Sequence, residues 1–218
     1  MTSIAACRVC RSDRLAEILD FGDLVLTGVF PASREEHVSS GRVRLLLCQE
    51  CGLVQLGDTF PPAEMYGDNY GYRSGLNASM VAHLERIAHR LEARVGLAPG
   101  DRVLDIGAND GTLLRSYTTP GLVRVGIDPT IAKFREYYPG DITAVDDFFT
   151  AAAYERVADG PARIVTSIAM FYDLDDPVAF ARDIRSALAD DGVWYFEQSY
   201  MPWMLRSGAY DTICHEHL

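Results

Sequence analysis

The chain has 218 residues, a formal net charge of −11, 48% apolar residues and 23% charged residues. This composition is ordinary for a globular protein, and its acidic balance repels phosphate backbones, which argues against a nucleic-acid partner. No apolar run approaches the roughly 20 residues of a membrane helix. The start "MTSIAACRVC" lacks a signal-peptide layout, so we expect no membrane association and a cytoplasmic protein with reduced thiols.

Residues 1–60 contain four of the five cysteines, arranged as two CxxC pairs: Cys7 with Cys10 and Cys48 with Cys51. Two residues between thiolates let one tight turn direct both sulfurs at a single tetrahedral ion. Two such turns close a four-thiolate site with no open position for substrate. We therefore predict structural zinc in a small β-rich domain, with free or redox-active pairs as the alternative.

Residues 61–78 are rich in proline, glycine and tyrosine, which predicts a tyrosine-rich extended linker. Residues 79–218 then alternate helical and β-like patterns. The first helical pattern has an apolar stripe at three- and four-residue spacings, and Pro99 with Gly100 ends it. The stripe consists of Met80, Leu84, Ile87, Leu91 and Val95. The five short β-like runs that follow predict an α/β fold with a parallel sheet covered on both faces.

The stretch "VLDIGANDGTLL", residues 103–114, places a glycine-rich turn between the first of these strands and a helix. Glycines there let the backbone approach a ligand at the carboxyl end of the strand. Acids inside the turn would repel the pyrophosphate of NAD but not a cationic sulfonium, which favours S-adenosylmethionine (SAM). The next two strands also end in acids. The predicted donor-binding residues are Asp105, Gly107, Asn109, Gly111, Asp128, Asp146, Asp147 and Phe148.

The turn resembles motif I of class I SAM-dependent methyltransferases, so we expect a Rossmann-like sheet of that class. Together with the cysteine pairs, the tyrosine-rich stretch "MYGDNYGYRSGLNASM" and the ending "YDTICHEHL", it resembles the nucleotide-deoxysugar C-methyltransferases of actinobacteria over essentially the whole chain. The resemblance implies methylation of carbon beside the ketone of a nucleotide-linked 4-keto-sugar, in deoxysugar and antibiotic biosynthesis.

The resemblance also implies roles for named residues. Glu216 and His217 are the implied acid and base, with His215 in support. The implied substrate-binding residues are Tyr66, Tyr70, Tyr72, Glu197, Gln198 and Tyr200. Some relatives have tyrosine where this chain has Cys214, and histidine near Tyr172, and these departures weaken a full transfer of mechanism.

Members of this family are nearly twice as long as this chain, so we expect the chain to be an amino-terminal fragment. We expect the segment "HEH" at its end to be poorly ordered. The fifth strand would be exposed at the edge of the sheet, which would favour a homodimer. Two other functions stay open: a SAM-binding module without turnover, and methylation at oxygen or nitrogen of another small molecule. A metal bound by "HEH" and mere packing of the linker tyrosines are further alternatives.

Overall fold

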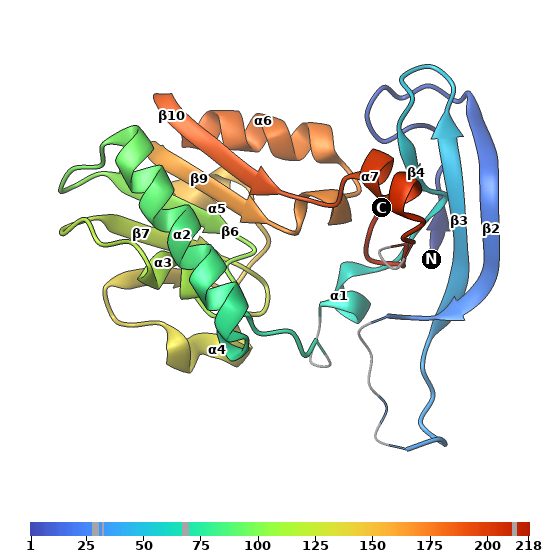
Figure 1. Ribbon diagram of the computed structural model, residues 1–218, viewed down its shortest axis with the longest axis horizontal. Coiled ribbons are helices and arrows are strands. Elements are labelled where there is room, and N and C mark those ends of the chain that lie inside the picture. The colour runs from blue at the N-terminus through green and yellow to red at the C-terminus, as the bar shows by residue number, and fades with distance from the viewer. Residues whose placement is uncertain (28–30, 32, 67–69, 211–212) are drawn as a thin grey trace. The chain divides into compact units, whose positions relative to one another are not determined.

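The computed structural model describes residues 1–27, 31, 33–66, 70–210 and 213–218 (Figure 1). Contacts divide the chain into two compact units. The first unit comprises residues 1–71, 171–179 and 198–218, and the second comprises residues 72–170 and 180–197. These units do not follow the linear boundaries 1–60, 61–78 and 79–218, which stay a prediction. Among the described helices, none is long and apolar enough to cross a membrane.

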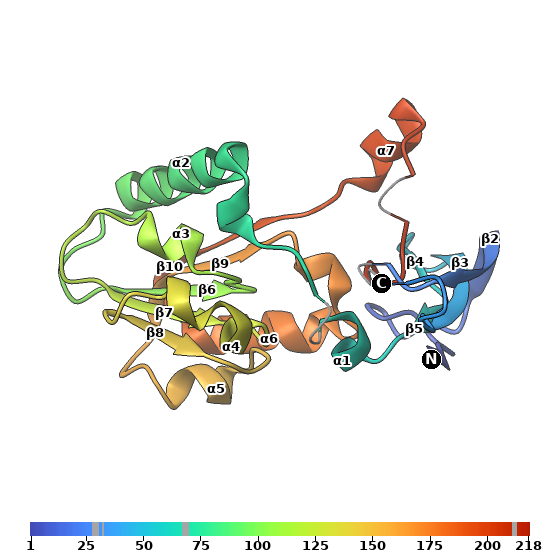
Figure 2. The same ribbon diagram turned by 90° about the horizontal axis from the view of Figure 1, so that it is seen from below.

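The second unit is built on a parallel sheet of five strands in the order β10-β9-β6-β7-β8. The strands are β6 (Arg102–Ile106), β7 (Val123–Ile127), β8 (Ile142–Val145), β9 (Ala162–Ile168) and β10 (Leu188–Glu197). Figure 2 shows α2 (Ala78–Val95) and α3 (Thr112–Arg115) on one face, with α5 (Ala151–Glu155) and α6 (Pro177–Ala187) on the other. The predicted α/β class and its five strands are confirmed.

Helix α2 confirms the amphipathic helix that the apolar stripe predicts. Asn77 begins the helix by accepting a hydrogen bond from the backbone N–H of Ser79, and Gly96 ends it in the left-handed region at φ 65°. Leu84, Ile87 and Leu91 are buried against the sheet, where they join the main apolar core. The helix ends before the predicted Pro99, because Gly96 adopts the left-handed conformation without strain.

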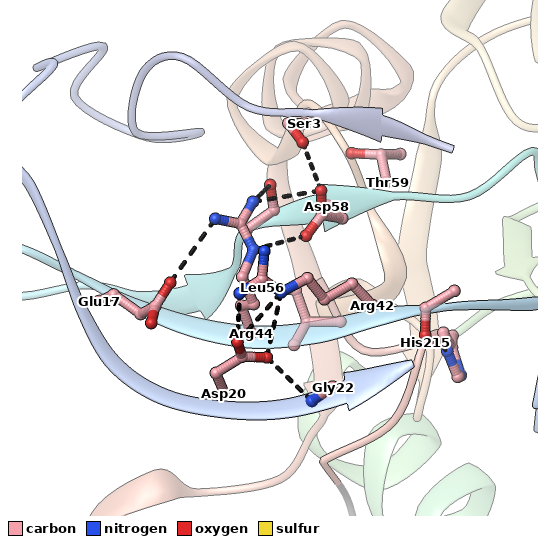
Figure 3. Close-up of polar contacts among 12 residues, drawn as sticks. Ser3, Glu17, Asp20, Gly22, Arg42, Arg44, Leu56, Asp58, Thr59 and His215 are labelled. Carbon is pink, nitrogen blue, oxygen red and sulfur yellow. Dashed lines mark hydrogen bonds and ion pairs between the residues drawn. The ribbon is translucent and has the colours of Figure 1, made fainter. Parts of the chain in front are cut away.

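The first unit contains two small antiparallel sheets. One has three strands in the order β2-β3-β4, with β2 (Leu15–Val25), β3 (Ser40–Cys48) and β4 (Val54–Leu56). The other pairs β1 (Thr2–Ser3) with β5 (Asp58–Thr59). Figure 3 shows the buried Asp58 on β5, which accepts hydrogen bonds from Ser3 and from Arg44 on β3 and so ties the two sheets together.

One sequence-based expectation was wrong, and one helix of the first unit was not predicted. The linker is not extended throughout, because Pro61 and Pro62 preset the backbone that begins the short helix α1 (Pro62–Met65), and a 3₁₀ turn, η1 (Ser74–Leu76), follows in the second unit. The helix α7 (Met201–Ser207) was not predicted at all. The helix is short and exposes Trp203 and Leu205, so its sequence has no apolar stripe from which a helix could be predicted.

Candidate functional site

The four paired cysteines converge on one point in the first unit. Their sulfur atoms all lie within 4.8 Å of one another, with Cys7 Sγ 3.7 Å from Cys51 Sγ and Cys10 Sγ 3.5 Å from Cys48 Sγ. Four sulfurs held tetrahedrally at about 2.3 Å from zinc lie roughly 3.8 Å apart. The four thiols therefore fit a closed zinc site.

The backbone of each CxxC turn favours this arrangement. The residue directly after each second cysteine adopts the left-handed region, at φ 62° for Arg11 and 79° for Gly52. Burial alone would raise the pKa of the Cys7 thiol, but the backbone N–H groups of Cys10 and Val9 lower the pKa of Cys7 to about 6. A thiolate is the form that binds metal, so the lowered pKa favours Cys7 as a ligand, whereas burial and the neighbouring cysteine sulfurs raise the pKa of Cys10 in the same turn.

The glycine-rich turn of the second unit connects β6 to α3 at the carboxyl edge of the sheet. Gly107 and Gly111 both have φ near +70°. A Cβ at Gly111 would lie 2.9 Å from the ring of Tyr138, and one at Gly107 would lie 3.1 Å from Met170. Glycine suits both the dihedral angle and the limited space there, since the room for a side chain is taken by Tyr138 and Met170. Donor binding at this turn stays a prediction.

Asn109 and Asp110 hold the segment before α2 against this turn. Asn109 Oδ1 accepts a bond of 2.9 Å from the N–H of Ser74, and its Nδ2 donates to the carbonyl of Tyr72. Asp110 accepts from the N–H of Gly75 at 3.0 Å. The side chain of Asn109, predicted to contact the donor, is thus occupied by protein groups.

Asp105 lies beneath the turn and is fully buried. Burial raises the pKa of Asp105 to about 7, opposed by the hydroxyl of Thr166 and reinforced by the nearby charge of Asp128. Thr166 donates that bond across 2.6 Å. Asp105 therefore supports the turn from below.

Asp128 follows β7 and presents a carboxylate at the same edge. It accepts hydrogen bonds from the N–H of Asn109 and from the N–H and hydroxyl of Thr130. A carboxylate offers about four acceptor positions, so roughly one remains for a ribose hydroxyl rather than the predicted two.

The acids after β8 face solvent. Asp147 accepts a bond from the N–H of Phe148 and pairs with Arg156 at 3.4 Å. Asp146 is exposed, and the ring of Phe148 is 51% exposed. An exposed ring beside acids suits an adenine ring, and donor binding by these residues stays a prediction.

The first unit brings together three polar side chains from distant segments. Asp173 lies in a 3₁₀ turn, η3 (Phe171–Asp173), and its Oδ1 is 4.0 Å from Nε2 of His217. Tyr66 lies at the end of α1, and its ring packs edge-on against Tyr70 at 5.6 Å. Among the described residues, neither the hydroxyl of Tyr66 nor Oδ1 of Asp173 makes a hydrogen bond of good geometry, although both atoms are buried. The two side chains nevertheless lie close enough for a hydrogen-bonding interaction that shifts the pKa of each.

Burial shifts both groups of this cluster toward their neutral forms. It raises the pKa of Asp173 to about 7, although nearby His217 and Tyr66 favour the ionised carboxylate, and Glu216 adds a repulsive charge. Burial, together with Asp173 and Glu216, also raises the pKa of Tyr66 above its ordinary value. Buried polar atoms without a good partner need an explanation, and a partly buried cluster with shifted pKa values is a candidate functional site.

The "HEH" segment is packed, which corrects the expectation that it is poorly ordered. Ile213 and Leu218 pack against an apolar cluster of β3 and β4, which secures both ends of the segment. His215 is 1% exposed, lies edge-on to Phe60 at 4.7 Å, and places Nε2 3.1 Å from the carbonyl of Gly41. These contacts place His215 inside the small unit, whereas His217 lies at Asp173.

Glu197 ends β10 and is already engaged within the second unit. Its Oε2 lies 2.7 Å from His83 Nε2, and its Oε1 accepts a bond of 2.7 Å from the hydroxyl of Tyr195. Gln198 and Tyr200 are exposed. The three remain predictions as substrate residues.

Sequence reasoning gave no role to Asp173. The stretch "FYDLDDP" offers three acids, and the resemblance directed attention to Tyr172 instead. Tyr172 packs edge-on against the ring of His217 at 4.3 Å. The signal for Asp173 was its position just after a buried strand, where parallel sheets collect functional groups.

Two family profiles match the chain: one for a zinc binding domain over residues 7–66 and one for a methyltransferase domain over residues 75–218. The chain therefore belongs to the methyltransferase-domain family and carries a zinc-binding module. SAM is accordingly the methyl donor and zinc the metal that the two families assign to it.

Among characterised proteins, the chain is similar to the C-methyltransferase NovU of Streptomyces niveus, with 28% identity over 98% of the chain. The chain spans about half, 52%, of that protein's length.

Among solved structures, the chain is similar to the plantazolicin methyltransferase BpumL in complex with SAH, at 13% identity and a TM-score of 0.48 over 62% of this chain and 53% of that one. Another is coclaurine N-methyltransferase, at 11% identity and a TM-score of 0.42 over 58% of this chain and 38% of that one.

Proposed function

We propose that the chain is the donor-binding and proton-transferring part of a SAM-dependent C-methyltransferase. Its acceptor would be a nucleotide-linked 4-keto-deoxysugar. The similarity to NovU, itself a C-methyltransferase, supports carbon as the methylated atom. The observation that carries the proposal is the partly buried cluster of Tyr66, Asp173 and His217 in the same unit as Glu216.

The donor would lie at the glycine-rich turn, with Asp128 accepting from its ribose and Phe148 beside its adenine. Bound there, SAM supplies an electrophilic methyl group. Gly107 and Gly111 give the turn its tight left-handed backbone, and the carboxylates add no repulsion against a cation.

Each residue of the cluster has a function in forming an enolate. Carbon beside a ketone is weakly acidic, and a base must take its proton while a donor stabilises the enolate oxygen. His217 would take the proton, and Asp173 would stabilise the resulting imidazolium at 4.0 Å. Tyr66 stays protonated because its pKa is raised, so its hydroxyl, which lies beside Asp173, can donate to the enolate oxygen. Glu216 would pass the proton to solvent.

The proposal is tested in two stages on the zinc-loaded chain. Calorimetric titration with S-adenosylhomocysteine should show binding, weakened about 10–100-fold by Asp128→Ala because a charged hydrogen bond is lost. A keto-sugar nucleotide deuterated beside the ketone should then lose deuterium to solvent, and His217→Ala should abolish the loss.

The controls separate the donor site from the base. His89→Ala, on an exposed part of α2, should leave both results unchanged. Binding without exchange would favour a SAM-binding module, and a methyl group found on oxygen or nitrogen by NMR of the product would overturn carbon methylation.

A further inference from the structure

The loop that carries Asp173 is attached to one of the CxxC turns. This loop, residues 171–176, contains the turn η3 and leads into α6, and it belongs to the first unit although the strand before it belongs to the second. Asp173 is a member of the partly buried cluster, and Asp175 and Asp176 follow it directly. The last two acids contact the turn formed by Cys7 and Cys10.

Arg8 is the main connection. It stands between the ligands Cys7 and Cys10, and its side chain is only 3% exposed. Its guanidinium donates to the carbonyl of Leu56 at 2.6 Å, to the hydroxyl of Thr59 at 2.8 Å and to Asp175 at 3.2 Å. A guanidinium is a rigid planar fork, so these three bonds fix the position of Asp175 relative to the cysteine turn.

Two neighbouring contacts strengthen the connection. Thr59 donates to Asp175 at 2.9 Å, which makes a closed set of bonds with Arg8. Thr59 lies beside Asp58, whose bonds to Ser3 and Arg44 hold β5 in place (Figure 3).

On the surface of the same turn, Arg11 pairs with Asp176 at 2.5 Å. Asp176 also accepts a bond from the N–H of Ala179 in the first turn of α6.

We propose that Arg8 is a positioning residue that transmits the metal-fixed shape of the Cys7–Cys10 turn to the loop bearing Asp173. Zinc then has a second effect besides stabilising its module: it holds the carboxyl of Asp173 beside His217. This inference rests on the proposed function for the role of Asp173, but the attachment of the loop can be tested without any substrate.

The experiment compares hydrogen–deuterium exchange in zinc-loaded Arg8→Gln, Asp175→Ala and Arg14→Ala proteins. Arg14→Ala is the matched control, because Arg14 follows the same turn but pairs with the exposed Glu50 at 2.9 Å. In the first two variants, amides of residues 171–176 should exchange at least about tenfold faster while zinc content stays at one ion per chain. Arg14→Ala should leave the loop unchanged.

Asp175→Ala keeps the test decisive if Arg8→Gln fails to fold, since Asp175 is 65% exposed and lies outside the metal turn. Unchanged exchange in the loop of zinc-loaded Asp175→Ala would overturn the inference.

A kinetic measurement distinguishes positioning from mere stability. In Asp175→Ala, kcat for loss of deuterium from the keto-sugar should fall about tenfold, while the Kd for S-adenosylhomocysteine stays the same because the proposed donor residues lie in the second unit. If wild-type protein shows no loss of deuterium, the proposed function fails, yet the exchange result in the loop still decides the attachment.

Discussion

The buried acids at the glycine-rich turn of the second unit and the partly buried Asp173 of the first unit differ in their hydrogen-bond partners. At the glycine-rich turn, Asp105, Asp110 and Asp128 each accept bonds from neighbouring N–H or hydroxyl groups of the protein. Oδ1 of Asp173 is buried, and no described residue donates a hydrogen bond of good geometry to it. The acids at the glycine-rich turn stabilise the backbone of that turn, whereas Asp173 can still accept a hydrogen bond from a ligand.

The difference indicates where reactivity is expected. A satisfied buried carboxylate stabilises the fold and gains little from a ligand. An unsatisfied pair such as Asp173 and the hydroxyl of Tyr66 carries a desolvation cost, which a substrate that supplies hydrogen-bond partners would relieve. The donor site therefore depends mainly on backbone shape, and the proposed acceptor chemistry depends on unsatisfied side chains.

The largest expected effect comes from removing the metal. Cys48→Ser should abolish zinc binding and unfold the first unit, since structural zinc in small domains is worth about 10–16 kcal/mol. Zinc content and hydrogen–deuterium exchange of β3 measure this effect, and exchange of β6 and binding of S-adenosylhomocysteine should persist. Cys214→Ser, which changes a cysteine outside the ligand set, should keep the ion. Loss of both units together would contradict their independence.

The second effect is a dependence of stability on pH. The pKa of Asp173 is about 7 in the folded chain against an ordinary 3.8, so its protonated form stabilises the fold fully below pH 4. That contribution is lost as pH rises to 7 and beyond, and is worth at most on the order of 4 kcal/mol.

Asp173→Asn cannot ionise, so its stability relative to wild type should rise between pH 5 and pH 8 in urea unfolding with saturating zinc. Asp13→Asn, which changes an exposed acid of the same unit, should show no such trend. A constant difference between Asp173→Asn and wild type at both pH values would show that Asp173 is ionised throughout.

The third effect tests the satisfied acids. Thr166→Val keeps the shape of the side chain but removes the donor to Asp105, so the second unit should lose about 1–3 kcal/mol. Trp194, whose indole N–H donates to Ser167 on β9, reports this unfolding by fluorescence in a Trp203→Phe background. Hydrogen–deuterium exchange in β3 should not change, and an unchanged midpoint for the second unit would contradict the structural role of Asp105.

The features that could be predicted from the sequence are those encoded over short spans. Two residues between cysteines define a turn, the three- and four-residue spacing defines α2, and the run from Asp105 to Gly111 defines the donor turn. Each pattern reflects a local backbone constraint, so the element it predicts does not depend on contacts with distant parts of the chain.

Features that depend on distant segments could not be predicted. The cluster of Tyr66, Asp173 and His217 joins three separate parts of the chain, and the bond from Arg8 to Asp175 joins two more. Arg8 reads as an ordinary residue between two cysteines, because nothing local shows that its side chain is buried. The resemblance supplied His217 and Tyr66, but only the fold shows the carboxyl between them.

The smallest change in stability is expected for Tyr66→Phe, and it separates the two kinds of site most sharply. The variant removes a buried hydroxyl that makes no hydrogen bond of good geometry among the described residues, so stability should stay within about 1 kcal/mol of wild type or rise. Tyr154→Phe is the matched control, because that buried hydroxyl donates to the carbonyl of Gly160 at 3.1 Å and its loss should destabilise the second unit by about 1 kcal/mol.

Loss of deuterium from the keto-sugar should respond in the opposite order. It should fall about 100-fold in Tyr66→Phe, because the enolate oxygen loses its donor, and stay unchanged in Tyr154→Phe. A Tyr66→Phe protein that is clearly less stable but equally active would mean that the hydroxyl serves the fold, and the contrast between satisfied and unsatisfied groups would then no longer locate the chemistry.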